Sequence, residues 1–327
     1  MRAVIITRPG GPEVLEVQDR PTPEPGAGQI RVRVRASALN RADLLQRAGN
    51  YPVPPGSPED IAGMEYAGEV DALGEGCQLW KKGDRVMGII GGGGHAEFVT
   101  VHEREAMPVP AGMSWENAAA IPEVFLTAYD ALFTRLSLRS GETLLIHAVG
   151  SGVGTAAVQL ATLIGARVIG TARSPQKLAR VKELGVDIGV DASKVDWATQ
   201  IEKEAGANGV DAILDLVGGN YLEGNLRVLA LKGRIVVVGL TAGHMAQFNM
   251  GVLLRKRGTV VGTTLRARPI EEKIALARDF SARMMPLFGS ERLKPIVDRV
   301  LSFDQMAEAH GVMESNTTFG KIVLVWR

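Results

Sequence analysis

The sequence predicts an α/β fold in which a doubly wound parallel sheet is inserted into a β-barrel domain. Three features support this prediction. Residues 144–177 have the pattern of strand, glycine loop, helix and strand, the first third is rich in short strands, and 321–325 is typical of a closing strand. The parallel-sheet part is therefore expected between two segments of the β-rich part.

The glycine loop is the most informative local signal. Residues 144–146 form a short apolar run typical of a buried parallel strand, and Gly150, Gly152 and Gly154 allow the backbone to turn sharply. The free N–H groups of a helix beginning here would face a pyrophosphate, as in dinucleotide-binding units. The window 149–154 has valine and serine at the first two glycine positions of G-x-G-x-x-G, so the loop alone is a weak indicator.

The residues after the next predicted strand, 167–171, indicate which nicotinamide cofactor is bound. An acidic side chain there would suit the 2′-hydroxyl of NAD. This chain instead has Arg173 and, one helical turn later, Lys177, in a helix that Ser174 caps and Pro175 opens. Two cations suit the 2′-phosphate of NADPH. The alternative is that both are solvated charges at an exposed helix start.

Composition limits the classes of function. The 327 residues are 46% hydrophobic, enough for two domains with their own cores. A net charge of +1 and 5% aromatic residues argue against a nucleic-acid partner. Cys77 is the only cysteine, which excludes an intrachain disulfide. No apolar run is long enough to span a membrane and no long apolar stretch begins the chain, so we expect a cytoplasmic protein with no membrane partner.

The pattern of elements changes twice along the chain. Short strands at 31–35, 66–70 and 96–99, separated by Pro/Gly-rich turns, predict a compact β barrel. From about Ile121 helices and strands alternate, with strands at 212–216 and 234–239, and a helix at 270–284 then leads to the closing strand. The expected domains are 1–122, the first part of the barrel domain; 123–266, the dinucleotide-binding domain; and 267–327, the return to the first domain.

Several motifs together resemble a known family. They are RPGGPEVLEV, ASALNRADLLQRAGNYPVPPG, GMEYAGEV, LWKKGDRVMGIIGGGGHAEFVTV, AAAIPEVFLTAYDAL, HAVGSGVGTAAVQLA and FGKIVL, and they cover nearly the whole chain. On these motifs the chain resembles the zinc-independent quinone oxidoreductases of the medium-chain dehydrogenase/reductase superfamily, most closely the p53-inducible type. The resemblance implies a GroES-like catalytic domain, a Rossmann domain, a cleft between them that holds NADPH, and a homodimer joined through the nucleotide domains.

The ligands of a catalytic zinc are missing from the matching positions. In the alcohol dehydrogenases of that superfamily cysteine and histidine hold the metal, whereas the matching stretches here, 39–43 and 63–65, have Asn40 and Met64. Amide and thioether groups are poor zinc ligands, and a single cysteine cannot build the four-cysteine structural lobe. We expect no metal site. The histidines are expected at the surface or satisfied in the core; they are His95, His102, His147, His244 and His310.

The resemblance implies catalytic roles for Asn40, Asp43 and Tyr51. Asn40 and Tyr51 are expected to line the pocket that faces the nicotinamide, and Asp43 is expected to hold the Asn40 loop or the substrate mouth. Each has a simpler alternative. Asn40 could cap a helix beginning near Ala42, and Tyr51 could be packing in the turn before Pro52.

The resemblance also implies the residues that bind NADPH. Thr127 is expected to bond the nicotinamide carboxamide or, alternatively, its own helix backbone. Lys321 is expected to reach the cofactor or to be a plain surface lysine. The expected cofactor-binding residues are Tyr51, Val124, Thr127, Gly150, Ser151, Gly152, Val153, Arg173, Lys177, Gly239, Leu240, Thr264, Leu265 and Lys321.

A dihydronicotinamide site without a metal suits an acceptor that is already electrophilic. We therefore expect an NADPH-dependent quinone oxidoreductase with a small-molecule quinone substrate. An enoyl-thioester or alkenal reductase would use the same hydride, and a non-catalytic NADPH-binding protein, like a lens crystallin of this family, is a third alternative. The apolar run 259–263 is expected at the open edge of the parallel sheet, where a homodimer would form.

Overall fold

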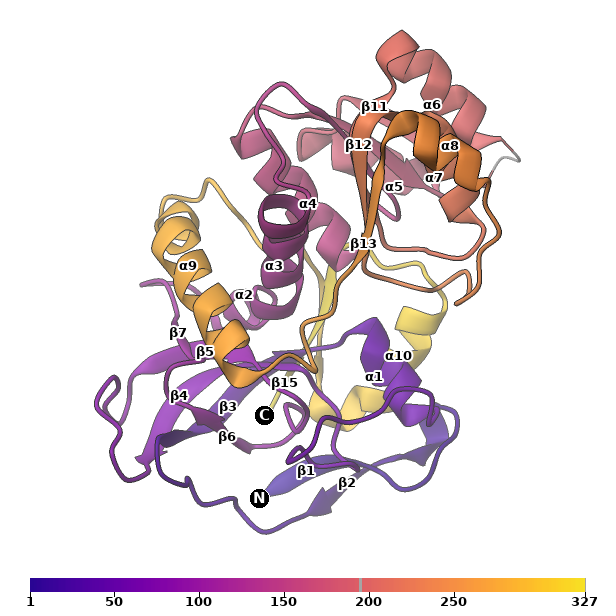
Figure 1. Cartoon of the computed structure of the whole chain (residues 1–327). Coiled ribbons are helices and arrows are strands. Elements are labelled where there is room, and N and C mark those ends of the chain that lie inside the picture. The colour runs from indigo at the N-terminus through magenta and orange to yellow at the C-terminus, as the bar shows by residue number, and fades with distance from the viewer. Residues whose placement is uncertain (194–195, 327) are drawn as a thin grey trace. The chain divides into compact units, whose positions relative to one another are not determined.

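The computed structural model describes residues 1–193 and 196–326 and divides the chain into two compact units (Figure 1). Unit 1 comprises Met1–Leu126 and Leu265–Arg327, and unit 2 comprises Thr127–Thr264. The chain therefore leaves unit 1, forms the whole of unit 2, and returns. The divisions lie at 126/127 and 264/265, where the sequence suggested 122/123 and 266/267.

Unit 2 alternates strands and helices. The predicted strands at 144–146, 167–171 and 212–216 are confirmed with shifts of one or two residues at their ends, and so is the helix after the glycine loop. The strand predicted at 234–239 is present but begins five residues earlier, at Leu229, and ends at Val237. In chain order the elements are β8 (Thr143–Ile146), α4 (Gly152–Leu163), β9 (Arg167–Ala172), α5 (Pro175–Glu183), β10 (Ile188–Asp191), α6 (Trp197–Ala205), β11 (Val210–Asp215), α7 (Tyr221–Val228), β12 (Leu229–Val237), α8 (Met250–Lys256) and β13 (Thr259–Gly262).

The strands of unit 2 form a parallel sheet in the order β10-β9-β8-β11-β12-β13. Successive strands are added outward from β8 on one side and from β11 on the other, so the order reverses between these two. This is the predicted doubly wound arrangement, and ligands of such sheets bind outside the carboxyl ends of the strands at the point of reversal. The run expected at the open edge forms β13, which is an edge strand.

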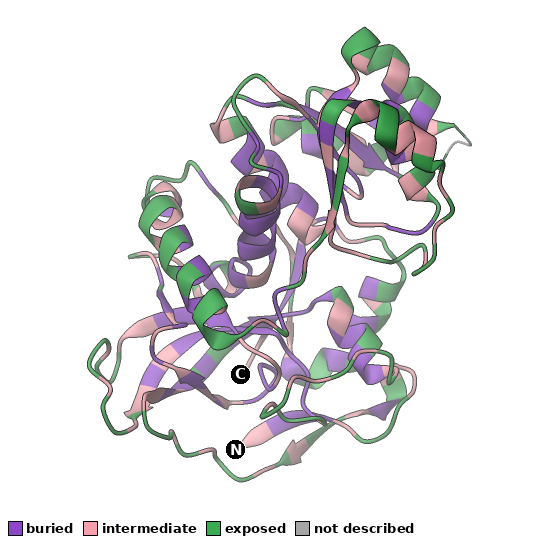
Figure 2. Ribbon diagram, viewed as in Figure 1, coloured by how far each residue is buried: buried purple, intermediate pink, exposed green. Residues whose placement is uncertain are grey.

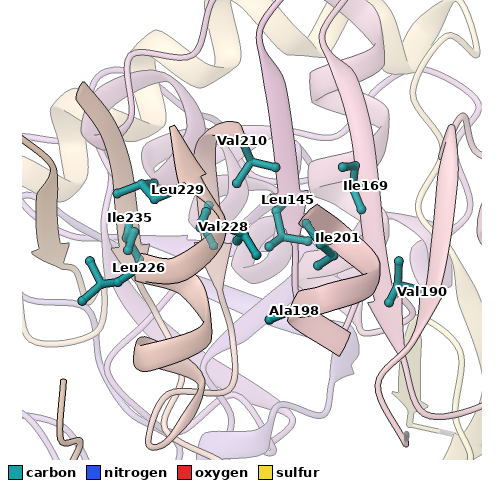
Figure 3. Packing of buried hydrophobic residues seen from close by; sticks show 11 residues of the cluster. Leu145, Ile169, Val190, Ala198, Ile201, Val210, Leu226, Val228, Leu229 and Ile235 are labelled. Atoms are coloured by element: carbon teal, nitrogen blue, oxygen red, sulfur yellow. The ribbon is translucent and has the colours of Figure 1, made fainter. Parts of the chain in front are cut away.

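An aliphatic core fixes the strands of unit 2. The fully buried side chains of Leu145, Ile169 and Ile213 come from three neighbouring strands. They pack in one cluster with Ile201 of α6 and Leu226 of α7 (Figure 3). Because close-packed interiors permit little movement, the loops that follow these strands start from fixed positions.

Unit 1 is mainly β-structure. It contains a two-stranded sheet, β1-β2, and a sheet with the strand path β14-β15-β3-β4-β5-β7, in which β6 also pairs with β3. Its elements are β1 (Arg2–Ile6), β2 (Leu15–Asp19), β3 (Gln29–Ala38), α1 (Arg41–Arg47), β4 (Glu65–Leu73), β5 (Arg85–Ile89), β6 (Phe98–His102), β7 (Met107–Pro108), α2 (Trp115–Ala119), α9 (Ile270–Gly289), β14 (Val297–Ser302), α10 (Met306–Glu314) and β15 (Lys321–Val325), while α3 (Pro122–Tyr129) contains the division between the units.

The C-terminal strand completes the sheet of unit 1. β15 has the predicted bounds, 321–325, and pairs antiparallel with β3, for example Leu324 with Ser37. Strand β6 begins at Phe98 instead of the predicted Ala96, because Ala96 forms an isolated bridge with Ala3 of β1. The C-terminal strand therefore pairs with a strand from the first part of the chain.

The alternating pattern of β3 explains its two faces. Ile30, Val32 and Val34 are buried in an aliphatic cluster. Arg33 and Arg35 point to the other face, where they pair with Asp71 and Glu69 of β4. A one-residue shift in register would bury these arginines, so the pattern specifies the register.

Helix α9 extends five residues beyond the predicted 270–284 and ends at Gly289. One side of it is buried, including Ile274 and Phe280, and the other side is exposed (Figure 2). No helix within residues 1–193 and 196–326 combines the length and apolarity needed to cross a membrane.

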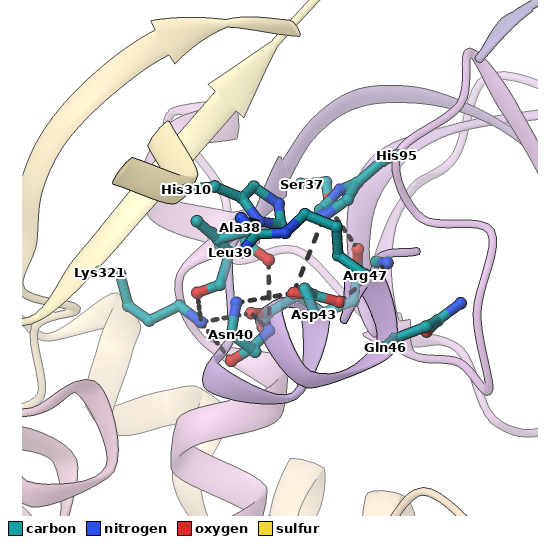
Figure 4. Close-up of polar contacts among 12 residues, drawn as sticks. Ser37, Ala38, Leu39, Asn40, Asp43, Gln46, Arg47, His95, His310 and Lys321 are labelled. Atoms are coloured by element: carbon teal, nitrogen blue, oxygen red, sulfur yellow. Dashed lines mark hydrogen bonds and ion pairs between the residues drawn. The ribbon is translucent and has the colours of Figure 1, made fainter. Parts of the chain in front are cut away.

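A buried histidine joins α10 to α1. The Arg47 guanidinium donates to Nδ1 of His310 at 3.1 Å (Figure 4). Arg47 also pairs with Glu314. Arginine has no acceptor, so Nδ1 of His310 is unprotonated and its proton is on Nε2, which has no hydrogen-bond partner. Burial lowers the pKa of His310 to about 3; Asp43 opposes the shift, and the charges of His95 and Arg47 add to it.

We predict that this histidine destabilises the protein in acid. The folded pKa lies below that of the unfolded chain, about 6.5, so the unfolded chain binds the proton more readily as the pH falls. The stability is present above about pH 6.5 and decreases toward pH 3, by up to about 1.4 kcal/mol per pH unit. The measurement is urea unfolding from pH 7 to pH 4 for the wild type and His310→Asn, whose amide oxygen can still accept from Arg47. The variant should show a shallower decrease, and equal slopes would contradict the prediction.

Candidate functional site

The loop after β8 forms a tight cradle at the N-terminus of α4. The side chain of Ser151 caps the helix, with Oγ accepting the backbone N–H of Gly154 at 3.1 Å. A Cβ at Gly154 would lie 2.5 Å from the carbonyl oxygen of Val149, so only glycine permits this close approach. Four of the expected cofactor residues lie here: Gly150, Ser151, Gly152 and Val153.

A buried polar network lies at the carboxyl ends of the neighbouring strands. His147, directly after β8, contacts Thr171 Oγ1 through Nδ1 at 2.9 Å and Asn225 Oδ1 through Nε2 at 2.6 Å. Asn225 donates to Asp215 at 2.9 Å, and Asp215 also accepts the backbone N–H of Gly218 at 2.8 Å. Burial lowers the pKa of His147, against the effects of Asp215 and Asn225, so the ring is neutral at pH 7. The network therefore ties the loops after β8, β9 and β11 together without a charged histidine.

The predicted start of α5 is confirmed. Pro175 is its first residue, and the Ser174 side chain accepts the backbone N–H of Lys177. Arg173, directly after β9, is exposed. It is close enough to Tyr221 that its charge opposes the rise that burial causes in the tyrosine pKa. Two cationic side chains therefore flank the N-terminal turn of α5.

The remaining expected cofactor residues of unit 2 follow other strands of the same sheet. Gly239 and Leu240 come after β12, and Thr264 comes after β13. A Cβ at Gly239 would lie 2.5 Å from the Leu216 carbonyl oxygen, so glycine allows the loops after β11 and β12 to approach. Because all strands are parallel, these residues share the carboxyl edge with the α4 loop. Val124 and Thr127 both lie in α3, Val124 in the part that belongs to unit 1 and Thr127 in the part that belongs to unit 2. Leu265 belongs to unit 1.

A second cluster, in unit 1, joins Asn40 and Lys321 (Figure 4) to the fully buried carboxylate of Glu65. Its Oε1 accepts from Asn40 Nδ2 at 2.9 Å and lies 2.7 Å from Lys321 Nζ. The Lys321 ammonium also donates to Asn40 Oδ1 at 2.6 Å and to the Leu39 carbonyl oxygen at 2.9 Å. Lys321 is 3% exposed, so the alternative of a plain surface lysine is wrong.

Asp43 holds the Asn40 loop through hydrogen bonds to backbone N–H groups. Its carboxylate accepts the backbone N–H of Asn40 at 2.7 Å and that of Gly63 at 3.0 Å. Burial alone would raise the pKa of Asp43, but contacts with His95 and the Asn40 N–H lower it overall. Asp43 has no exposed surface, so its contacts favour the loop-holding role over the substrate mouth. Asn40 is the N-cap of α1, as in the alternative prediction, and its side chain also bonds Lys321 and Glu65.

A buried serine, histidine and aspartate also meet in this region. Ser37 Oγ contacts His95 Nδ1 at 3.2 Å, and His95 Nε2 lies 3.7 Å from Asp43 Oδ2. All three side chains are at most 1% exposed, and Ser37 donates to the Glu65 carbonyl oxygen. A substrate cannot reach this serine, so the group has a structural role.

Tyr51 lies beside a cation that sequence reasoning missed. The Arg266 guanidinium lies 5.0 Å from the centre of the Tyr51 ring. Burial and the charge of Glu123 raise the pKa of Tyr51, while Arg266 acts in the opposite direction. The sequence does not predict the roles of Glu65 and Arg266, because a single charged residue in a loop or strand produces no periodic pattern. Their neighbours Met64 and Leu265, which directly precede them, were the residues with predicted significance.

The expectation for the histidines holds in part. His147 is satisfied in the core, and His244 is exposed. His95 and His310 are buried, but Nε2 of each has no hydrogen-bond partner. Where the structure is described, at 1–193 and 196–326, no three His, Cys, Asp or Glu side chains are grouped as metal ligands.

Comparison with known proteins agrees with this architecture. Residues 26–111 match the model of an alcohol dehydrogenase GroES-like domain, and residues 152–283 match that of a zinc-binding dehydrogenase. The chain is 35% identical to the human synaptic vesicle membrane protein VAT-1 homolog, covering 99% of this chain and 86% of that protein. It is 30% identical to the quinone oxidoreductase of Rattus norvegicus, covering 99% and 98%.

Solved structures resemble the whole chain. A mycobacterial protein complexed with NADPH has a TM-score of 0.88 at 30% identity and covers 99% of this chain and 100% of its own. The CurK enoyl reductase has a TM-score of 0.89 at 28% identity and covers 100% and 99%. With full-length relatives, a GroES-like domain and a doubly wound sheet, this chain belongs to the medium-chain dehydrogenase/reductase superfamily.

Proposed function

We propose that the protein is an NADPH-dependent quinone oxidoreductase that transfers a hydride from NADPH to a quinone without a metal ion. The observation that carries the proposal is that the Lys321 ammonium is bound by Asn40 and Glu65. Asn40 and Glu65 lie in the two stretches, 39–43 and 63–65, that match the zinc-ligand stretches of alcohol dehydrogenases. Full-length similarity to quinone oxidoreductases supports the choice of acceptor.

The side chains at this position do not suit zinc. Asn40 offers an amide and Met64 a buried thioether, and both are poor zinc ligands. Oε1 of Glu65 already faces the Lys321 ammonium at 2.7 Å. A cation is thus supplied by the chain itself, and the proposed reaction uses no metal.

We predict that metal removal has no effect. Elemental analysis of the purified protein should find no stoichiometric zinc, and dialysis against a chelator should leave the turnover rate and the melting temperature unchanged. One zinc per chain, lost together with activity, would contradict the proposal.

Replacing Lys321 should instead destabilise the protein, because it leaves the buried Glu65 carboxylate without its cation. We expect Lys321→Met to lower the free energy of unfolding by about 3–5 kcal/mol. In a Glu65→Gln background the same replacement should cost much less, because no charge is then left unpaired. Denaturant unfolding of the two single variants and the double variant measures this, and equal costs in both backgrounds would show that the ion pair is not responsible.

NADPH is the proposed cofactor. The cradle at α4 offers backbone N–H groups to a pyrophosphate, and Arg173 and Lys177 at the start of α5 suit a 2′-phosphate. Similarity to a structure complexed with NADPH supports this choice. The other proposed contacts are Tyr51, Val124, Thr127, Gly239, Leu240, Thr264, Leu265 and Lys321.

We predict that Lys177→Ala weakens NADPH binding about tenfold or more, because a charge-assisted hydrogen bond contributes about 1.5–3 kcal/mol. NADH, which lacks the 2′-phosphate, should bind equally well to both proteins. Lys182→Ala, an exposed lysine in the last turn of the same helix, is the matched control and should change neither affinity. Equal losses for NADPH and NADH, measured by fluorescence titration, would place Lys177 in a structural role.

The proposed chemistry needs little from the chain beyond orientation. When bound, NADPH supplies a hydride from C4 of its dihydronicotinamide ring. The Tyr51 phenol is protonated at neutral pH, because the ordinary pKa of tyrosine is about 10 and burial raises it further, so its hydroxyl can donate a hydrogen bond to the acceptor oxygen. The quinone gains the hydride, and its oxygen takes a proton from water. The products are a hydroquinone and NADP⁺.

An enoyl-thioester reductase is the second candidate, favoured by the similarity to the CurK and JamJ enoyl reductases at 28% and 26% identity. It would transfer the same hydride to a conjugated thioester. The two functions differ only in the acceptor, so a comparison of acceptors separates them. A protein that binds NADPH but reduces neither class would support the non-catalytic alternative.

We predict NADPH-dependent turnover with ortho-quinones or naphthoquinones and essentially none with simple alcohols or unactivated ketones. Tyr51→Ala should lower kcat/KM for the quinone, because a displaced acceptor loses its reactive geometry. NADPH affinity should stay nearly intact, because Tyr51 is only one of many proposed NADPH contacts. Tyr51→Phe is the matched control that keeps the ring and isolates the hydroxyl. Stopped-flow measurement of NADPH consumption gives both constants. Rapid reduction of an enoyl thioester with no quinone activity would favour the second candidate.

A homodimer is the proposed assembly. The edge strand β13 has Val260 38% exposed, and the neighbouring α8 leaves Met250 and Leu254 at 66% and 76%. Exposed apolar side chains beside an unpaired strand edge favour pairing with a second copy across a two-fold axis. Light scattering should give the mass of two chains, and the mass of one would contradict the proposal. The cytoplasmic location and the absence of a nucleic-acid partner stay predictions from the sequence.

A further inference from the structure

A cavity of about 360 Å³ lies in unit 1, beside the residues proposed to meet the acceptor. Its walls include Pro54, Pro55 and Ser57 from the loop after Tyr51, Gly91, and the segment from Arg266 to Ile270 at the start of α9. The walls are thus partly apolar and partly cationic. The volume is that of a small binding site for a compact ring.

Arg266 is distinctive among the buried cations. Three arginine or lysine side chains of the described residues are buried: Arg47, Arg266 and Lys321. Arg47 pairs with Glu314, and Lys321 pairs with Glu65. For Arg266, 7% exposed, the structure gives no carboxylate within ion-pair distance in the described part of the chain. A buried charge without a counter-charge is costly, and proteins usually pair it.

The contacts of Arg266 hold it in place without neutralising it. Nε donates to the Gly91 carbonyl oxygen at 2.7 Å, and Nη2 donates to Gln46 Oε1 at 2.7 Å. Both acceptors are neutral, and Nη1 has no hydrogen-bond partner. Burial lowers the pKa of Arg266 overall, although the charges of Asp43, Tyr51 and Glu123 act in the opposite direction from beyond ion-pair distance. An arginine that is fixed, charged and incompletely bonded is suited to binding an anion.

Two further cations line the cavity, Arg268 and Lys273, and both are less buried than Arg266. Lys273, in the first turn of α9, lies 2.7 Å from Glu105 Oε1. Arg266 is the only one of these three cations that is buried, so it is the group whose charge a ligand would compensate. The Tyr51 ring lies 5.0 Å from the same guanidinium, so a ligand held by Arg266 would also be near Tyr51.

We infer that this cavity binds the carboxylate of an anionic acceptor, and that Arg266 gives the enzyme a preference for quinones or conjugated carbonyl compounds that carry such a group. The inference rests on the proposed function, because it names the class of acceptor for the same reaction. A carboxylate would supply the missing counter-charge and two acceptor oxygens for the guanidinium, while the apolar walls contact the ring. No covalent step is involved.

The kinetic test uses two acceptors that differ only in charge: a para-benzoquinone with an acetate side chain, and its methyl ester. Wild-type protein should reduce the carboxylate with a kcat/KM about tenfold or more above that of the ester. Arg266→Gln should abolish this preference while changing the ester by less than about threefold, and Arg266→Lys, which keeps the charge, should retain part of it. Arg278→Gln removes an exposed charge from α9 and should change neither acceptor. No preference in the wild type, or equal losses for both acceptors in Arg266→Gln, would overturn the inference.

A binding test separates this inference from the proposed function. Calorimetric titration of the full-length protein with phenylacetate, which cannot be reduced, should show binding that Arg266→Gln weakens about tenfold or more. Phenylacetamide should not bind detectably. Phenylacetate binding that depends on Arg266, in a protein that reduces no quinone or enone, would support the site and overturn the proposed reaction. If inorganic phosphate binds as tightly as phenylacetate, the cavity is a general anion site and the acceptor assignment is overturned. If the wild-type protein does not bind phenylacetate, while the wild type and the variants have the same melting temperature, the assignment is overturned as well.

Discussion

The carboxylate of Glu65 is the contact on which the candidate catalytic region depends. Its two oxygens bind the Asn40 amide, the Lys321 ammonium and the backbone N–H of Glu123. The beginnings of α1 and α3 and the closing strand β15 thus meet at one side chain that has no exposed surface. Removing a partner from such a group leaves a buried charge uncompensated, which costs several times more than an ordinary surface ion pair. The position of Asn40 is therefore set by electrostatics as much as by packing.

Unit 2 uses a hydrogen-bonded network without a cationic side chain for the same purpose. There the ends of β8, β9 and β11 are joined through His147, Thr171, Asn225 and Asp215, and both nitrogens of the histidine have partners. A network whose members are all satisfied makes its region rigid. The loop before α4, which is proposed to bind the pyrophosphate, follows His147 of this network directly in the chain. In unit 1, by contrast, Nη1 of Arg266 has no hydrogen-bond partner. The contrast distinguishes residues that support a site from one that is suited to receive a ligand.

Sequence patterns predicted the elements better than the contacts between them. The alternation in β3, the glycine loop before α4 and the cap of α5 each act over a few residues, so their outcome is visible locally. The sequence alone does not decide whether Lys321 contacts the cofactor or lies at the surface, because its burial depends on Glu65 and Asn40, which are distant in the chain. Arg266 and Glu65 escaped notice for the same reason. The start of β6 was misplaced because Ala96 pairs with Ala3, another long-range contact. The roles of the cofactor and catalytic residues stay predictions, since they concern molecules that the fold alone does not specify.

The insertion of unit 2 into unit 1 has a consequence for synthesis of the protein. Lys321 and Asn40 are 281 residues apart, so the ammonium that neutralises Glu65 is synthesised long after the Asn40 loop. Every strand of unit 2 is made before it. Because domains generally fold as units during translation, unit 2 can reach its final structure while the sheet of unit 1 still lacks β15. Of the two units, unit 1 is therefore begun before unit 2 and completed after it. Until Lys321 has been synthesised, the Glu65 carboxylate of the nascent chain lacks the ammonium that neutralises it.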